Sequence, residues 1–146
     1  MNIRMILKNL GVVILVEAFC MVPSLLVSII YGDGTFSVFL YSILICAAIG
    51  LLIYQTPIRS KNFYARDGFA FVALSWIIVS LFGSLPFVLS GIIPSFTDAF
   101  FEAASGFTTT GATILQQIEG LPHGLLFWSN FTNWMGGMGV LVLTIA

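Results

Sequence analysis

Four long apolar runs with almost no charge constrain this chain more than any other feature. Only Glu17 is charged among all of their residues, and the runs are Leu10–Ile30, Gly34–Ile58, Gly68–Thr97 and Leu125–Ala146. About 20 predominantly apolar residues suffice for a helix to cross the hydrocarbon core of a bilayer. With 59% hydrophobic and 8% charged residues overall, the chain is predicted to be an all-α integral membrane protein.

The basic residues predict how these spans are oriented. All of them lie before the first run or between the second and the third: Arg4, Lys8, Arg59, Lys61 and Arg66. Because basic residues gather on the cytoplasmic side of a membrane, we place the N-terminus and the loop 59–67 in the cytoplasm. The turn at Gly32–Gly34 is then outside.

Proline and glycine predict where the spans bend or approach one another. Pro23 should kink the first span, and Gly83 and Pro86 allow the third span to bend near its outer end at Leu89. The run M-G-G-M-G at Met135–Gly139 follows no strand and lacks the G-x-G-x-x-G spacing of a dinucleotide loop. We therefore expect tight helix packing or a hinge there.

The segment Thr97–Thr113, T-D-A-F-F-E-A-A-S-G-F-T-T-T-G-A-T, separates the third and fourth runs. Its helical part, about 98–105, covers about 12 Å, which is less than half of a hydrocarbon core. Backbone that is not helical is tolerated at membrane depth only where protein surrounds it or water lines it. The segment therefore predicts a re-entrant pore loop.

The direction of this short helix predicts the charge that it favours. Thr97 is the expected N-cap, and Asp98 and Glu102 lie in or near the first turn, where carboxylates are favourable. The last carbonyls, at Ser105 and Gly106, are then expected to be unpaired and to point at the threonines that follow. Such an end favours a cation, whereas an anion would need the amide end of a helix.

The Thr/Gly segment at about 108–113 has the composition of a cation filter strand. The carbonyls of Thr109, Thr110 and Gly111 are expected to face the ion in place of water, with threonine hydroxyls bracing the strand or adding a ligand. Gly111 permits the positive φ that turns successive carbonyls to one side. Since one strand cannot replace a hydration shell, this segment is at most a quarter of a pore.

Glu17 is a carboxylate inside a predicted span. Such residues are costly and usually face a bundle interior, a water-filled cavity or a partner. One interpretation is a residue that attracts cations or docks another helix. The other is an acid that is held protonated or hydrogen-bonded between helices.

The remaining polar residues give weaker signals. Cys20 and Cys46 lie near the middle of apolar runs and are expected to be buried free thiols. His123 has no ligand partner at useful spacing and is expected to face solvent or lipid headgroups. Three polar residues of the last span are expected either to line a wet vestibule or, as we favour, to hydrogen-bond neighbouring helices: Asn130, Thr132 and Asn133.

Three consecutive stretches together resemble a known family. They are D-G-F-A-F-V-A-L-S-W-I-I-V-S-L-F-G-S-L-P-F, then D-A-F-F-E-A-A-S-G-F-T-T-T-G-A-T, and then N-W-M-G-G-M-G-V-L-V-L-T-I-A. They resemble the bacterial Trk potassium uptake membrane subunit of the Trk/Ktr/HKT superfamily, over nearly the whole chain. Two helices before the first pore unit look like the Trk branch.

The resemblance implies transport of potassium through four such units in one polypeptide, each filter strand having a single glycine. Thr109, Thr110 and Gly111 match the first strand, with Ala112 as a possible outer edge. It also implies a homodimer in the bacterial inner membrane, gated by a cytoplasmic nucleotide-binding ring protein, with no cofactor. Because the chain stops after one unit, it is expected to be a fragment or a truncated product.

The expected organisation is two N-terminal transmembrane helices in residues 1–58, a cytoplasmic loop at 59–67, and one helix, pore loop and helix unit of a potassium-channel-like pore at 68–146. Two other classes stay open: a small helical scaffold or interaction subunit, and part of a secondary transporter with broken helices. An enzyme is disfavoured because no nucleophile with a base and no ligand cluster occurs. A net charge of -1 without a basic patch argues against nucleic acid.

Overall fold

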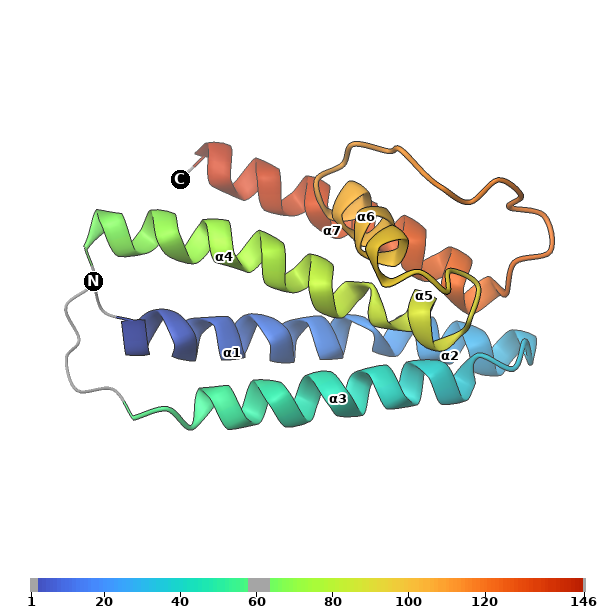
Figure 1. The fold of residues 1–146 in the computed structure, drawn as a ribbon, viewed down its shortest axis with the longest axis horizontal. Coiled ribbons are helices and arrows are strands. Elements are labelled where there is room, and N and C mark those ends of the chain that lie inside the picture. Colours follow the sequence, from blue (N-terminus) through green and yellow to red (C-terminus); the bar gives the residue numbers. More distant parts are fainter. Residues whose placement is uncertain (1–2, 58–63, 146) are drawn as a thin grey trace.

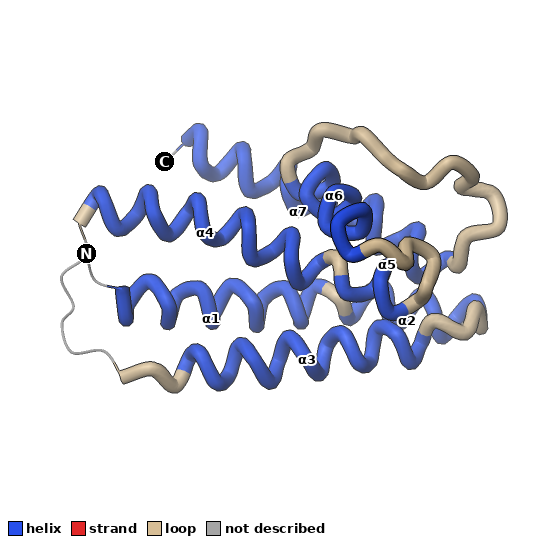
Figure 2. Tube along the Cα trace, in the orientation of Figure 1, coloured by secondary structure: helices blue, strands red, loops and turns tan. Residues whose placement is uncertain are grey.

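The computed structural model describes residues 3–57 and 64–145, with side chains through Gly139. Within these ranges the secondary structure is entirely helical, which confirms the predicted all-α class (Figures 1 and 2). The helices are α1 (Ile3–Cys20), α2 (Val22–Tyr31), α3 (Phe36–Tyr54), α4 (Ala65–Gly83), α5 (Leu85–Leu89), α6 (Phe96–Phe107) and α7 (His123–Ile145).

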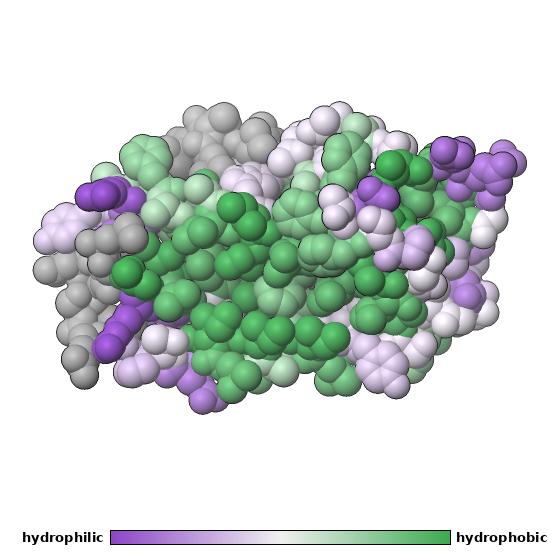
Figure 3. All heavy atoms as spheres, viewed as in Figure 1, coloured by the Kyte–Doolittle hydropathy of each residue, from purple (hydrophilic) through white to green (hydrophobic). Residues whose placement is uncertain are grey.

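The helices are long and apolar enough for a membrane protein. Three stretches of the described chain meet the length and hydropathy needed to cross a bilayer: Ile3–Tyr31, Phe36–Tyr54 and Ala65–Leu89. The fourth expected span lies on α7, whose 23 residues cover about 34 Å at helical rise. Figure 3 shows hydrophobic residues over the middle of one face and hydrophilic residues toward both ends.

The long helices lie side by side, and the short helix α6 is inclined to them (Figure 1). Helix α1 packs against α3 and α4, whereas α7 packs against α2 and α6. Buried Ile14, Met21, Phe39 and Trp128 belong to one hydrophobic core. The turn at 32–35 and the start of α7 share one end of the bundle, and both chain termini lie toward the other end.

Two of the spans are interrupted where the sequence predicts bends. The first breaks at Met21, before Pro23, which opens α2. The third breaks at Ser84, before Pro86, and α5 continues it. Proline cannot donate to the preceding turn. At the second break the amide of Phe87 donates to the carbonyl of Ser84 and not to that of Gly83. The carbonyl of Gly83 accepts from the indole N–H of Trp128 on α7, at 2.9 Å, which joins the two helices.

Asp33 joins the turn after α2 to the start of α7. One carboxylate oxygen accepts hydrogen bonds from the hydroxyls of Ser28 and Thr35, at 2.6 and 2.7 Å, and from the Thr35 amide at 3.0 Å. The other accepts from the amide of Gly124 at 2.8 Å, across 91 residues of sequence. Asp33 thus caps α7 from another part of the chain, where a negative charge is favourable.

These hydrogen bonds set the acidity of Asp33. Burial acts to raise the pKa, but the bonds from Gly124, Ser28 and Thr35 outweigh it and lower the pKa from 3.8 to about 2. The ionised form is therefore the one that holds the start of α7 in place.

The isolated cysteines and histidine are largely as expected. Both thiols are free, but only Cys46 is buried; full burial of Cys20 was wrong, because Cys20 lies beside a cavity. His123 is exposed and stacks on Tyr31, with ring centroids 4.1 Å apart. The predicted loop 59–67 lies outside the described residues from 59 to 63, and Ala65–Asp67 already belong to α4.

Asp33→Asn is expected to flatten the acid dependence of stability. Because its pKa is lowered on folding, Asp33 stabilises the fold above about pH 4, and this contribution is lost as the pH falls toward 2. Thermal unfolding in detergent micelles between pH 2 and 7 measures how the melting temperature depends on pH, with Asp98→Asn as the control. If the melting temperature fell equally between pH 4 and 2 in the wild type and in Asp33→Asn, this role of Asp33 would be contradicted.

Candidate functional site

The site is built on α6, which is shorter than a span. Its 12 residues cover about 18 Å at helical rise. The N-cap is Ser95, whose side chain accepts from the Asp98 amide at 3.4 Å. The predicted cap at Thr97 is therefore wrong, since the chain turns two residues earlier and Thr97 is already helical, while Asp98 lies in the first turn as expected.

The last turn of α6 presses against the middle of α7. A Cβ built on Gly136 would overlap the carbonyl of Phe107, and one built on Gly106 would overlap the hydroxyl of Thr132. On the other side, a Cβ on Gly83 would lie 2.6 Å from the Phe107 ring. Gly136 thus confirms tight helix packing at M-G-G-M-G, and the contact places the end of α6 near the midpoint of α7.

The end of α6 is closed by the threonines that follow it. The amide of Thr109 donates to the carbonyl of Gly106 at 2.9 Å, and the amide of Thr110 donates to that of Ser105 at 3.0 Å. Together with a φ of 56° at Thr109, this is a Schellman motif. The expectation that these two carbonyls are unpaired is therefore wrong. A β-branched residue is rarely found in this left-handed conformation.

Past the motif, three successive carbonyls are left free. Within the described part of the chain, the carbonyl oxygens of Thr109, Thr110 and Gly111 accept no hydrogen bond. The next carbonyl, that of Ala112, accepts from the hydroxyl of Ser105 at 2.6 Å. Gly111 has the expected positive φ, at 75°, and residues 108–113 are all exposed.

The threonine hydroxyls brace the segment. Thr108 donates to the carbonyl of Ala104 at 2.7 Å, and its oxygen lies 2.8 Å from the hydroxyl of Thr110. Since a hydroxyl has one proton, Thr110 is the donor in the second bond. Of the two predicted roles for threonine hydroxyls, bracing is the one that these two side chains take.

The bracing role of Glu102 is what sequence reasoning missed at this site. It is 6% exposed, accepts from the Thr113 hydroxyl through both carboxylate oxygens at 3.0 Å, and accepts from the Ile114 amide at 3.1 Å. It therefore fixes the far end of the segment, as Ser105 fixes Ala112. The available signal was its spacing of three residues from Ser105, which puts both on one helix face.

The polar residues of α7 do not take the role that we favoured, whereas the wet vestibule stays a prediction. Side chains on α7 bond carbonyls of α7 itself: Asn130 donates to Leu126, and both Thr132 and Asn133 donate to Ser129. The favoured hydrogen bonds to neighbouring helices were wrong, because α6 approaches α7 so closely at Gly106 that Thr132 makes a steric contact there.

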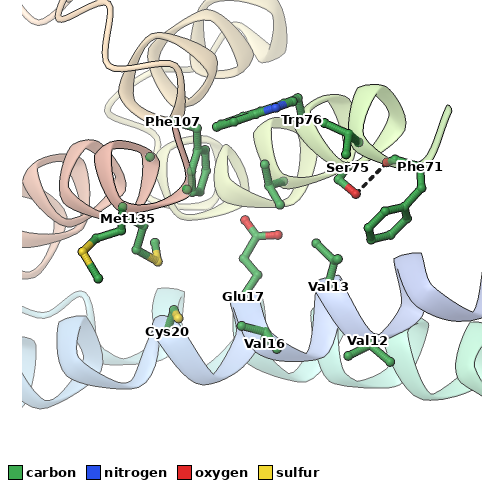
Figure 4. A pocket seen from close by; sticks show the side chains of 15 residues that line it. Val12, Val13, Val16, Glu17, Cys20, Phe71, Ser75, Trp76, Phe107 and Met135 are labelled. Atoms are coloured by element: carbon green, nitrogen blue, oxygen red, sulfur yellow. Dashed lines mark hydrogen bonds between the residues drawn. The ribbon is translucent and has the colours of Figure 1, made fainter. Parts of the chain in front are cut away.

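Glu17 is buried, but not hydrogen-bonded between helices. Neither of its carboxylate oxygens has a hydrogen-bond partner among the described residues, so the expected hydrogen bond between helices is absent in this range. That Glu17 is held protonated stays a prediction. Figure 4 shows the side chain reaching from α1 into a cavity bordered by α4 and Phe107.

Fold and site together define a class: helical membrane proteins in which a half-length helix and an extended segment lie between two long helices. Residues 35–146 match the TrkH family, described as a cation transport protein. The chain belongs to this family.

Individual relatives agree over the whole chain. It is 42% identical over 148 residues to the Trk system potassium uptake protein TrkH of Halomonas elongata, and 37% identical to that of Escherichia coli strain K12. Each alignment covers 100% of this chain and 31% of the relative. The crystal structure of the potassium transporter TrkH from Vibrio parahaemolyticus matches with a TM-score of 0.92 at 34% identity, covering 99% of this chain and 31% of that one. The chain thus spans about a third of these proteins.

Gly136→Ala is expected to destabilise the protein by about 1–3 kcal/mol, because the added methyl group meets the Phe107 carbonyl. Gly139→Ala is the matched control, since its Cβ would meet nothing nearer than Trp76 at 3.9 Å. Thermal unfolding of the purified chains in micelles measures both. Equal melting temperatures for the two variants would contradict the close contact.

Glu102→Gln is expected to loosen the segment that follows α6. Weakening the hydrogen bonds to the Glu102 side chain by about 1–2 kcal/mol raises amide exchange by about 5- to 30-fold. Hydrogen exchange at Ile114 measures the change, and Glu119→Gln in the exposed loop is the control. Unchanged protection of Ile114 in Glu102→Gln would rule out the brace.

Proposed function

We propose that this chain is part of a protein that transports potassium across a membrane, and that residues 109–111 form one strand of its selectivity filter. The observation that carries the proposal is the row of three free carbonyls on an exposed segment that begins where α6 ends. Potassium filters use rows of backbone carbonyls in place of the hydration shell of the ion.

The backbone conformation supports this assignment. Positive φ occurs at Thr109 and again at Gly111, and not at Thr110 between them. Alternation of left-handed with ordinary residues turns successive peptide groups the same way, with amides on one side and carbonyls on the other. Since the Thr109 and Thr110 amides bond the end of α6, the carbonyls are the groups left for an ion.

The depth of the segment is consistent with a pore loop. The end of α6 touches Gly136 near the midpoint of α7, and a Cβ on Gly137 would meet the methyl group of Thr109. The chain from 108 to 122 then returns to the end of the bundle where α7 begins (Figure 2). If α7 spans the bilayer, the segment begins near the bilayer midplane. Non-helical backbone is tolerated there when it lines a wet passage.

One strand does not make a filter, so the proposal includes further strands. By the family resemblance, residues 68–146 are the first of four units and residues 1–58 an added two-helix region. The matched proteins of Halomonas and Escherichia are named potassium uptake proteins, which favours potassium as the ion. Ala112 marks the outer edge of the strand, where the free carbonyls end.

We extend the proposal to the setting of the protein. The chain lies in a bacterial inner membrane with its N-terminus in the cytoplasm, because every basic residue belongs to that side. The turn at 32–35 and the start of α7 then share the outer side, as their link through Asp33 requires. A homodimer and a cytoplasmic nucleotide-binding ring protein are the partners that the resemblance implies.

Gly111→Ser, made in the complete transporter, is expected to reduce potassium uptake or its selectivity over sodium by about 5- to 30-fold. A side chain in left-handed backbone costs about 1–2 kcal/mol, and relaxation of Gly111 would turn its carbonyl away from the ion. Rubidium uptake in potassium-starved cells, with and without competing sodium, measures the effect.

Gly120→Ser is the matched control for this experiment. Gly120 also has a positive φ, and neither glycine has an atom within 4 Å of a built Cβ, so both variants carry similar backbone strain. Wild-type uptake and selectivity in Gly111→Ser would favour a scaffold over a filter. Saturable uptake of an organic substrate coupled to an ion would favour a secondary transporter.

A further inference from the structure

Glu17 lies at the midpoint of the span Ile3–Tyr31 and is not part of the proposed filter strand, residues 109–111. It is 4% exposed, and both carboxylate oxygens lack a hydrogen-bond partner among the described residues. A buried ionised carboxylate is costly unless a cation or hydrogen-bond donor compensates it. The chain itself supplies no such donor in the described range, so a bound cation is what would favour the ionised form.

A cavity of about 510 Å³ lies beside this carboxylate, between α1, α4 and α7. Its walls are mainly aliphatic and aromatic, and Trp76, Phe71 and Phe107 are among the lining residues (Figure 4). Ser75 also lines it, but its hydroxyl donates to the carbonyl of Phe71 at 2.8 Å. Glu17 is therefore the charged group of an otherwise largely apolar site.

The mouth of the cavity lies on the outer surface of the described helices. Three of its lining residues are partly exposed there: Val12 at 40%, Val16 at 56% and Met138 at 50%. The first two belong to α1 and the third to α7, and these helices pack mainly against other neighbours, so the mouth lies between them. In this chain a ligand can reach Glu17 by this route.

The lining selects among possible cations. Metal ions need several oxygen ligands to replace their water, and this cavity offers one carboxylate. An ammonium ion with apolar substituents needs only a counter-ion, aromatic faces for its charge and apolar walls for its substituents. We propose that the cavity binds a hydrophobic ammonium ion, with Glu17 as its counter-ion. This site does not depend on the filter assignment.

The depth of Glu17 favours a free amphiphilic ammonium ion over a lipid headgroup. Headgroups lie at the surfaces of the bilayer, whereas Glu17 is halfway along a span. A ligand that partitions into the hydrocarbon core matches this position of Glu17.

Binding of radiolabelled tributylmethylammonium to the full chain, purified in maltoside micelles, tests the proposal. The wild type should bind saturably, and Glu17→Gln should bind about tenfold more weakly or worse, because the counter-ion is lost while the side-chain volume is kept. Val13→Phe, which fills the cavity and leaves Glu17 in place, should lose binding as well. Leu26→Phe, on an exposed face of α2 outside the cavity, should bind like the wild type.

Three results would overturn the proposal: no saturable binding by the wild type, equal affinity in Glu17→Gln, or unchanged affinity in Val13→Phe. Displacement of the probe by phosphatidylcholine would overturn the assignment to a free ammonium ion. Size-exclusion profiles and helical content establish that each variant is folded. Should Glu17→Gln fail this check, Val13→Phe decides alone.

Discussion

The close approach of α6 to α7 is the contact on which the remaining arrangement depends. Gly136 lets the Phe107 carbonyl reach the backbone of α7, and Gly106 makes room for Thr132 from the opposite side. Without a hydrophobic driving force between helices in lipid, small residues and close packing hold helices together. Here the contacts of Gly106 and Gly136 place the C-terminal end of the half-length helix α6 beside the midpoint of α7. This position of the end of α6 determines where the threonines and their free carbonyls lie. It also determines where Glu102 and Ser105 can brace the segment.

What could be predicted from the sequence is what a single stretch of residues determines. Apolar runs predicted the long helices, Pro23 and Pro86 predicted the two breaks, and Gly111 predicted a positive φ. Each of these effects arises within about one turn of the chain. The left-handed Thr109 could not be foreseen, since isolated threonine avoids that conformation and accepts it only where surrounding contacts compensate. Glu102 was assigned to the helix dipole because its partners lie 11 and 12 residues away, across a turn whose path the sequence does not define.

Contacts between segments that are distant in the sequence could not be predicted either. Asp33 reaches the first turn of α7 across 91 residues, and Trp128 bonds the carbonyl that the break at Gly83 releases across 45. Each satisfies a backbone group that a helix end or a break leaves open. The sequence shows that such groups exist, but which side chain satisfies them depends on how the helices are arranged. For the same reason Glu17 could be recognised as unusual, although the cavity beside it could not.

The bracing of the segment after α6 has a consequence for biogenesis. Its hydrogen bonds join residues no more than 12 positions apart, between Ser95 and Leu115. Such short loops close early and at small entropic cost. A nascent chain can therefore shape this segment as soon as α6 and α7 are inserted, before later parts of the polypeptide are translated. Where several such segments must come together around one pore axis, segments that are already folded need only to dock against one another.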